Sequence, residues 1–212
     1  MTTLYRQRTA FEKQILAELS TRLKKTTWKK RGFAVFNQTG KFFQDVSIAV
    51  HRNAMLTVAE LRFKPMALDP ILWDILGMQE NYLQPLSFRA LGAFTCPSLP
   101  IYEAQIEQFG DTPAAVADKL VSLCEDNSLL CTDMLSKSSF SSLVAAHPKQ
   151  SERGAYAITL VASLIDDGDF ALAHRTAEAY ASGALSSSAR MSSGGKEFHQ
   201  LALEWLEAKE RA

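Results

Sequence analysis

The chain has 212 residues, of which 47% are hydrophobic and 22% charged, with 10 Gly, 7 Pro and 3 Cys. These values are typical of a globular protein and exclude a disordered, collagen-like or disulfide-stapled chain. No apolar run reaches the roughly 18–20 residues that cross a bilayer. No apolar signal segment follows Arg6 and Arg8 either, so we expect no membrane partner. The three cysteines are an odd number without C-x-x-C spacing, which predicts a reduced, cytoplasmic protein.

The net charge is zero, but it is divided unevenly along the chain. Residues 1–64 hold 13 Lys and Arg against 4 Asp and Glu, a net charge of +9, and residues 65–212 therefore carry −9. Such a division favours either two recognition surfaces of opposite sign or an electrostatic fit between the two parts. If the parts pack together, much of the charge asymmetry is internal to the fold.

The first third of the chain predicts a helix followed by an antiparallel meander. Thr9 and Glu12 form a capping-box pattern, and the helix that they begin is expected to end near Arg31, before Gly32. Its apolar stripe consists of Phe11, Ile15, Leu16, Leu19 and Leu23. The expected strands cover residues 33–38, 42–50 and 55–64, with turns at Thr39-Gly40 and Arg52-Asn53.

The remainder is mostly helical in pattern. Asp69-Pro70 is typical of the N-cap and first residue of a short helix that ends at Gly77, and a fourth strand is predicted over 88–94. Further helices are expected from residue 113 onward and over 154–165, 170–182 and 196–211, with Asp169 as an N-cap.

The fold class indicated by these elements is α+β. An N-terminal helix packs on an antiparallel β-meander, and an all-helical C-terminal part follows. We divide the chain into an α+β domain at 1–109, basic over 1–64, and an acidic helical domain at 110–212, which can pack as one unit.

The sequence contains no recognisable catalytic, cofactor-binding or metal-binding motif. The sequence lacks the patterns H-E-x-x-H, G-x-S-x-G and a strand-borne G-x-G-x-x-G. Cys124 and Cys131 do not have the spacing of a zinc-binding or redox-active cysteine pair. We therefore predict no cofactor and no metal. An enzyme assembled from dispersed residues stays open as an alternative, with Cys96 as its candidate thiol nucleophile.

A basic cluster follows the first apolar stripe. Cations in the last turn of a helix are favoured by the helix macrodipole, which gives the cluster a structural interpretation. Functionally, it could contact an acidic protein partner or the phosphates of a nucleic acid. The aromatic residues available to stack on bases are Trp28, Phe33, Phe36 and Phe42. The candidate interaction surface comprises Arg22, Lys25, Trp28, Lys29, Lys30 and Arg31.

A second candidate surface is acidic. Its members lie at one predicted turn and along the last predicted helix, without the spacing of an EF-hand. N-capping and a solvated helix face explain the same pattern structurally. The residues are Asp166, Asp167, Asp169, Glu204 and Glu207.

The run Lys30-Arg31-Gly32-Phe33, placed between a helix and paired strands, resembles a group of uncharacterised bacterial α+β domains of the immunity-protein type. The resemblance covers residues 9–64 and depends on Gly32 and Phe33. It implies a protein that binds and neutralises another protein, and it implies no catalytic residues.

The leading hypothesis is a non-enzymatic, cytoplasmic protein-interaction module, bacterial and immunity-like, whose partner is another protein. A nucleic-acid-binding module that uses residues 22–31 is the alternative from a different class. The oligomeric state stays open.

Overall fold

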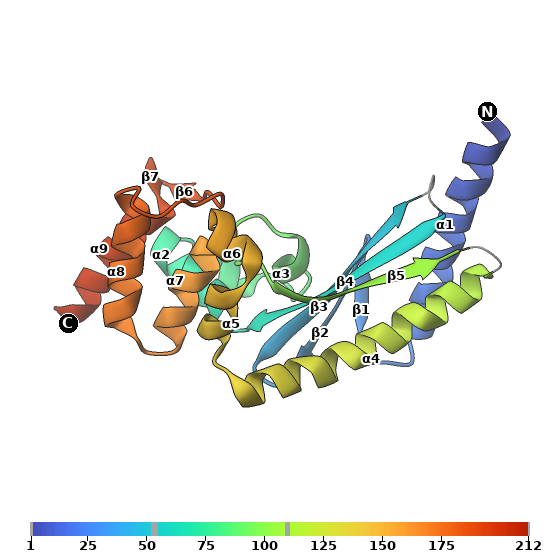
Figure 1. Cartoon of the computed structure of the whole chain (residues 1–212), viewed down its shortest axis with the longest axis horizontal. Coiled ribbons are helices and arrows are strands. Elements are labelled where there is room, and N and C mark those ends of the chain that lie inside the picture. Colours follow the sequence, from blue (N-terminus) through green and yellow to red (C-terminus); the bar gives the residue numbers. More distant parts are fainter. Residues whose placement is uncertain (1, 52–54, 109–110, 212) are drawn as a thin grey trace. The chain divides into compact units, whose positions relative to one another are not determined.

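The computed structural model describes residues 2–51, 55–108 and 111–211 (Figure 1). The chain forms two compact units, each assembled from two separate stretches. Unit 1 comprises Met1–Phe63 and Pro100–Met134, and unit 2 comprises Lys64–Leu99 and Leu135–Ala212. Both units are thus discontinuous in sequence, whereas the sequence analysis divided the chain once, between residues 109 and 110. The α+β class is confirmed, because an N-terminal helix is followed by an antiparallel sheet and then by helices.

Unit 1 is a sheet with two long helices. Its elements are α1 (Thr2–Leu23), β1 (Lys29–Arg31), β2 (Ala34–Thr39), β3 (Phe42–His51), β4 (Leu56–Pro65), β5 (Leu99–Glu107) and α4 (Pro113–Lys137). In the described part of the chain the strand order is β1-β2-β3-β4-β5. The predicted meander is confirmed as β2, β3 and β4, while the expected turn at Arg52-Asn53 lies outside the described residues.

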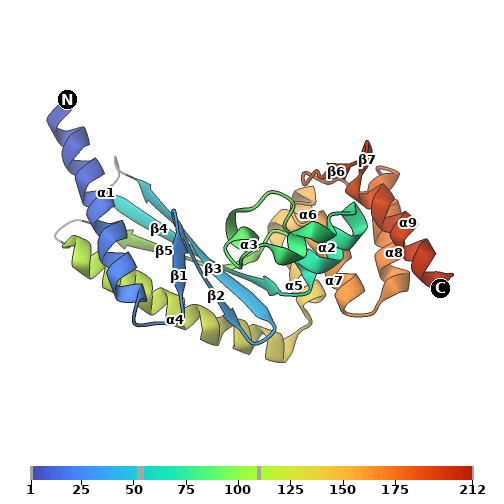
Figure 2. The same cartoon turned by 180° about the vertical axis from the view of Figure 1, so that it is seen from behind.

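The core of unit 1 lies between its sheet and its two helices. Ile15 and Leu19 of α1 pack with Val46 of β3 and Leu61 of β4, and α4 adds Leu120 to the same cluster. The apolar stripe of the first helix is therefore confirmed. Figures 1 and 2 show α4 running along the sheet.

Two predictions about the first helix are wrong. The helix begins at Thr2, so Thr9 lies within it and is not its N-cap, and it ends at Leu23 instead of Arg31. A turn stops it, because Thr26 donates its backbone N–H and its hydroxyl to the Leu23 carbonyl, while its Oγ1 accepts the N–H of Trp28. This turn leads Trp28 into the core, where its side chain is buried.

Unit 2 consists mainly of helices. Its elements are α2 (Leu68–Leu76), the 3-10 helix η1 (Gln79–Leu83), α3 (Phe88–Leu91), α5 (Phe140–Ala146), α6 (Pro148–Arg153), α7 (Ala157–Asp166), α8 (Phe170–Ala181), the short hairpin β6 (Ser192–Ser193) and β7 (Lys196–Glu197), and α9 (Phe198–Glu210). The strand expected over 88–94 is wrong, since that stretch begins as α3, whereas the helical pair α7–α8 and the last helix are confirmed. Helix α7 is buried almost all round and contacts α2, α5, α8 and α9.

A buried ion network organises the first stretch of unit 2. Asp69 was expected to cap a helix, but α2 begins at Leu68 and the Asp69 carboxylate instead accepts bonds from the Lys64 ammonium (2.9 Å), Arg89 (2.9 Å) and the Cys96 backbone N–H (2.7 Å). Lys64 also donates to the carbonyls of Arg89 (3.2 Å) and Cys96 (2.6 Å). Lys64 and Asp69 are both fully buried, so these bonds satisfy charges that water cannot reach.

We expect Asp69→Ala to destabilise the protein by roughly 3–5 kcal/mol, because it leaves two cations without their shared carboxylate. Asp74→Ala is the matched control: Asp74 lies on the same helix but accepts its bond from the exposed Tyr82 hydroxyl, so a loss of about 1 kcal/mol or less is expected. Denaturant unfolding followed by circular dichroism measures both. Equal losses for the two variants would show that the buried network is not central to stability.

Candidate functional site

Strand β5 is an outer strand, with a sheet neighbour on one side only among the described residues. The backbone N–H of Gln108 donates to the Met55 carbonyl at 2.9 Å, which fixes the register of the chain beyond β5 against β4. Backbone groups alternate in direction along a strand, so Glu103, Gln105 and Glu107 direct their N–H and C=O groups away from β4. This edge is available for pairing with another extended chain.

The two faces of β5 differ in chemistry. Tyr102 lies on the face that carries α4, together with the core residue Leu61. Successive side chains of a strand point to opposite faces, so Glu103, Gln105 and Glu107 lie on the other face, and all three are exposed. The edge is therefore apolar on one face and acidic on the other.

An apolar groove runs between β5 and α4. A cavity of about 420 Å³ is lined there by Leu61, Tyr102, Leu123, Asp126, Leu129 and Leu130. Leu61 is fully buried, whereas Tyr102 is 52% exposed, Leu129 71% and Leu130 37%. Large apolar side chains gathered at an exposed site are typical of a binding surface, whereas a single exposed leucine is not.

Buried polar contacts hold α4 in the position that creates the groove. The Asn127 side chain donates to the backbone carbonyls of Arg62 (3.3 Å) and Asp45 (3.5 Å), and the Ser128 hydroxyl donates to Gln44 (2.9 Å). These bonds fix one helical turn directly before Leu129 and Leu130. Packing thus places the two exposed leucines beside β5.

The charge division of the linear sequence is largely neutralised within the folded units. Unit 1 contains 13 Lys and Arg against 11 Asp and Glu, a net charge of +2, and unit 2 contains 10 against 12, a net charge of −2. Because α4 folds with the basic first stretch, Arg22 forms an ion pair with Asp118, which lowers the pKa of that carboxyl. The excess of +9 therefore does not describe a single surface.

The predicted basic surface is distributed over several elements. Arg22 pairs with Glu18 and Asp118, Lys25 is exposed in the turn after α1, and Trp28 is buried. Lys29, Lys30 and Arg31 form β1, the opposite edge of the sheet from β5. Of the aromatic side chains considered for base stacking, Phe33 is exposed, while Trp28, Phe36 and Phe42 are buried or half-buried.

The predicted acidic residues serve local structure in unit 2. Asp169 caps α8 by accepting the Leu172 N–H at 3.0 Å, which confirms its role as an N-cap, and Asp167 accepts a bond from the Ser141 hydroxyl. On α9, Glu204 pairs with Lys196 and Glu207 with Arg211. Asp166 is the last residue of α7.

The cysteines and histidines are separated by the fold. Cys96, Cys124 and Cys131 are free and buried, and the four histidines belong to β3, the α5–α6 junction, α8 and α9. Burial raises the pKa of the Cys96 thiol, with a further increase from the Asp69 carboxylate. Burial likewise raises the pKa of Cys124 and of Cys131 to about 12. No metal-binding group of three His, Cys, Asp or Glu occurs among the described residues.

Sequence reasoning missed β5 and the groove beside it. The alternation of Tyr102, Ala104 and Ile106 with polar neighbours was an available strand signal, but the sequence analysis predicted no element there. The groove had no local signal, because Tyr102 and Leu129 meet only through tertiary packing. Within the described part, no helix is long and apolar enough to span a membrane.

All three cysteines should resist alkylation while the protein is folded. At mildly alkaline pH the thiolate fraction of Cys124 and Cys131 should be roughly a thousandfold below that of unfolded cysteines, because burial disfavours the charged form, and burial lowers the thiolate fraction of Cys96 as well. Mass spectrometry after iodoacetamide treatment measures this, with the protein in concentrated guanidinium chloride as control. Rapid labelling of Cys96 in the folded protein would contradict the prediction and favour the enzyme alternative.

Searches found no family model, no curated protein and no solved structure that matches the chain. The resemblance to immunity-type domains over residues 9–64 therefore stays a prediction.

Proposed function

We propose that this protein is an interaction module that binds an extended segment of another protein along β5. The observation that carries the proposal is the apolar groove formed by Tyr102, Leu129 and Leu130 directly beside an open strand edge. Edge strands bind extended peptides through backbone hydrogen bonds, while adjacent pockets select alternate side chains.

The chemistry of the two faces specifies the partner segment. In a strand added beside β5, every second side chain would face α4 and enter the groove lined by Leu129 and Leu130. The intervening side chains would lie beside Glu103 and Glu107, where Lys or Arg is favoured. The proposed ligand is therefore an extended segment in which apolar residues alternate with basic ones.

The acidic residues of β5 also have a structural interpretation. Charged side chains on an edge strand discourage pairing with other edges and thereby limit aggregation. Like charges repel, however, whereas a basic strand is attracted, so Glu103 and Glu107 select among partners instead of blocking all of them. A neutralising role of the immunity type is the most specific form of this proposal. The segment bound along β5 would then belong to the surface through which the neutralised protein acts.

The opposite edge provides the second candidate. Lys29, Lys30 and Arg31 of β1 favour an acidic partner, nucleic acid included. Phe33 is the exposed aromatic beside them, which leaves little stacking surface for bases. The apolar groove at β5 thus favours a protein partner over a nucleic acid.

We expect Leu129→Glu to weaken peptide binding without unfolding the protein, because Leu129 is mostly exposed yet lines the groove. The probe is a displayed library of extended peptides, and fluorescence anisotropy then gives the affinity of the selected peptides. Selection should yield alternating apolar and basic residues, and Leu129→Glu should weaken binding by at least about tenfold. Glu103→Lys should reduce affinity in a salt-dependent manner.

Two control variants separate this site from other surfaces. Leu83→Glu changes a leucine of unit 2 that is even more exposed, and Lys29→Glu changes the charge of the opposite sheet edge. Both should bind the selected peptides as the wild type does. Selection of peptides without the alternation, or undiminished binding by Leu129→Glu, would contradict the proposal.

A further inference from the structure

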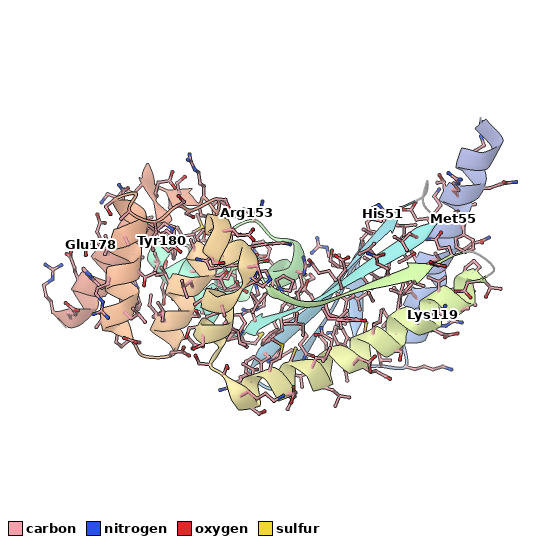
Figure 3. All side chains as sticks on the ribbon, in the orientation of Figure 1. His51, Met55, Lys119, Arg153, Glu178 and Tyr180 are labelled. Carbon is pink, nitrogen blue, oxygen red and sulfur yellow. The ribbon has the colours of Figure 1, made fainter. Side chains whose placement is uncertain are left out.

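Unit 2 contains a polar cavity of about 480 Å³ beside the end of α8 and the start of α9. Figure 3 shows Tyr180, one of its lining residues, on α8. The side chains that matter below are Tyr180, Ser186, Arg190, Glu197, His199 and Gln200. The cavity is separate from the β5 groove, and its lining residues were not among the predicted site residues.

The chain between α8 and β6 forms one wall of the cavity and is firmly anchored. Leu185 donates its backbone N–H to the Ala179 carbonyl (2.9 Å), and Ser188 donates to the Arg153 carbonyl (3.0 Å). A Cβ at Gly154 would lie 2.0 Å from the Ser186 carbonyl oxygen, so only glycine allows this close approach. The wall is therefore a packed part of unit 2.

Two lining side chains keep hydrogen-bond donors that the fold does not use. The Tyr180 hydroxyl accepts a bond from the Gln150 amide at 2.5 Å, which leaves its own proton available. Gln200 accepts the Glu197 backbone N–H through Oε1 at 3.2 Å, which leaves its amide N–H groups available. Both side chains can donate to a bound molecule.

Three further donors lie in the same wall. The Arg190 guanidinium and the Ser186 hydroxyl line the cavity, and both side chains are exposed. His199 is 8% exposed, and neither of its ring nitrogens has a hydrogen-bond partner among the described residues. The ring is stacked on Tyr180 with centroids 4.7 Å apart, and burial lowers its pKa to about 4, so it is neutral near pH 7.

The acidic group of the wall is engaged in part. The Glu197 carboxylate accepts the backbone N–H of Gln200 in the capping box of α9 and keeps its other acceptor sites. The wall also presents a guanidinium, a hydroxyl proton and an amide, and a ligand group with several acceptor oxygens can bind these three donors at once.

We propose that this cavity binds a small anionic molecule through a carboxylate or phosphate group held by Arg190, Tyr180 and Gln200. Carboxylates and phosphates supply several acceptor oxygens and match the fork of an arginine side chain. The Ser186 hydroxyl and the N–H of the neutral His199 ring complete the donor set. The Glu197 carboxylate on the wall favours a ligand of low charge.

Titration of the full-length, ¹⁵N-labelled protein with inorganic phosphate and, separately, with succinate tests the proposal by NMR. At least one anion should produce saturable shifts of the side-chain N–H signals of Arg190 and Gln200, and the stronger binder identifies the preferred group. Arg190→Gln should weaken that binding about tenfold, as the loss of a charge-assisted bond predicts. Tyr180→Phe, which preserves the stack on His199, should weaken it by a smaller factor.

Arg175→Gln is the matched control, because Arg175 is exposed on α8 and does not line the cavity. It should bind both anions as the wild type does. Equal weakening by Arg175→Gln and Arg190→Gln would overturn the proposal, because it would indicate general charge attraction. The absence of saturable shifts with either anion would overturn it as well.

Gly154→Ala tests whether the chain between α8 and β6 shapes the site. Loss of anion binding by this variant in a folded protein would support the proposal, whereas unchanged anion binding would contradict it.

Discussion

Unit 2 depends on one buried carboxylate. Asp69 accepts bonds from Lys64, Arg89 and the backbone of Cys96, and so holds the end of β4, helix α3 and the segment before β5 around the start of α2. A second contact, from the Thr159 hydroxyl to the Pro97 carbonyl at 3.1 Å, fastens that segment to the central helix α7. Buried charges tolerate few alternative arrangements, and the loss of one partner leaves the others uncompensated, so this network both fixes the path of the chain and is costly to break.

Charge along the sequence and charge on the folded units lead to different conclusions. The linear pattern suggested two oppositely charged halves, yet the basic first stretch shares its unit with the acidic α4, and Arg22 pairs with Asp118 across the two helices. In the folded unit, the two edges of one sheet carry opposite charges. The basic edge has Lys29, Lys30 and Arg31, and the acidic edge has Glu103 and Glu107. Local polarity of this kind selects partner segments, whereas a net charge mainly steers encounter.

Periodicity predicted most elements but not their assembly. The stripe through Ile15 and Leu19, the alternation in β3 and β4, and the caps at Gly77 and Asp169 were all readable, because each depends on neighbours within a few residues. The predicted end of the first helix was wrong, because the Thr26 side chain forms a turn with the Leu23 carbonyl and leads Trp28 into the core. The groove and the donor-rich cavity were unreadable, because their residues come together only when distant segments pack.

The placement of β5 has a kinetic consequence. β4 and β5 are neighbours in the sheet, yet residues 66–98 lie between them in sequence. Closing so long a connection costs entropy before any pairing is gained, and strands that pair across it tend to join late in folding. Until β5 pairs with β4, β4 is the outer strand of the meander, and α4 does not yet cover its alternate apolar residues. During synthesis, the nascent chain would thus expose a transient strand edge that a chaperone or another chain could occupy.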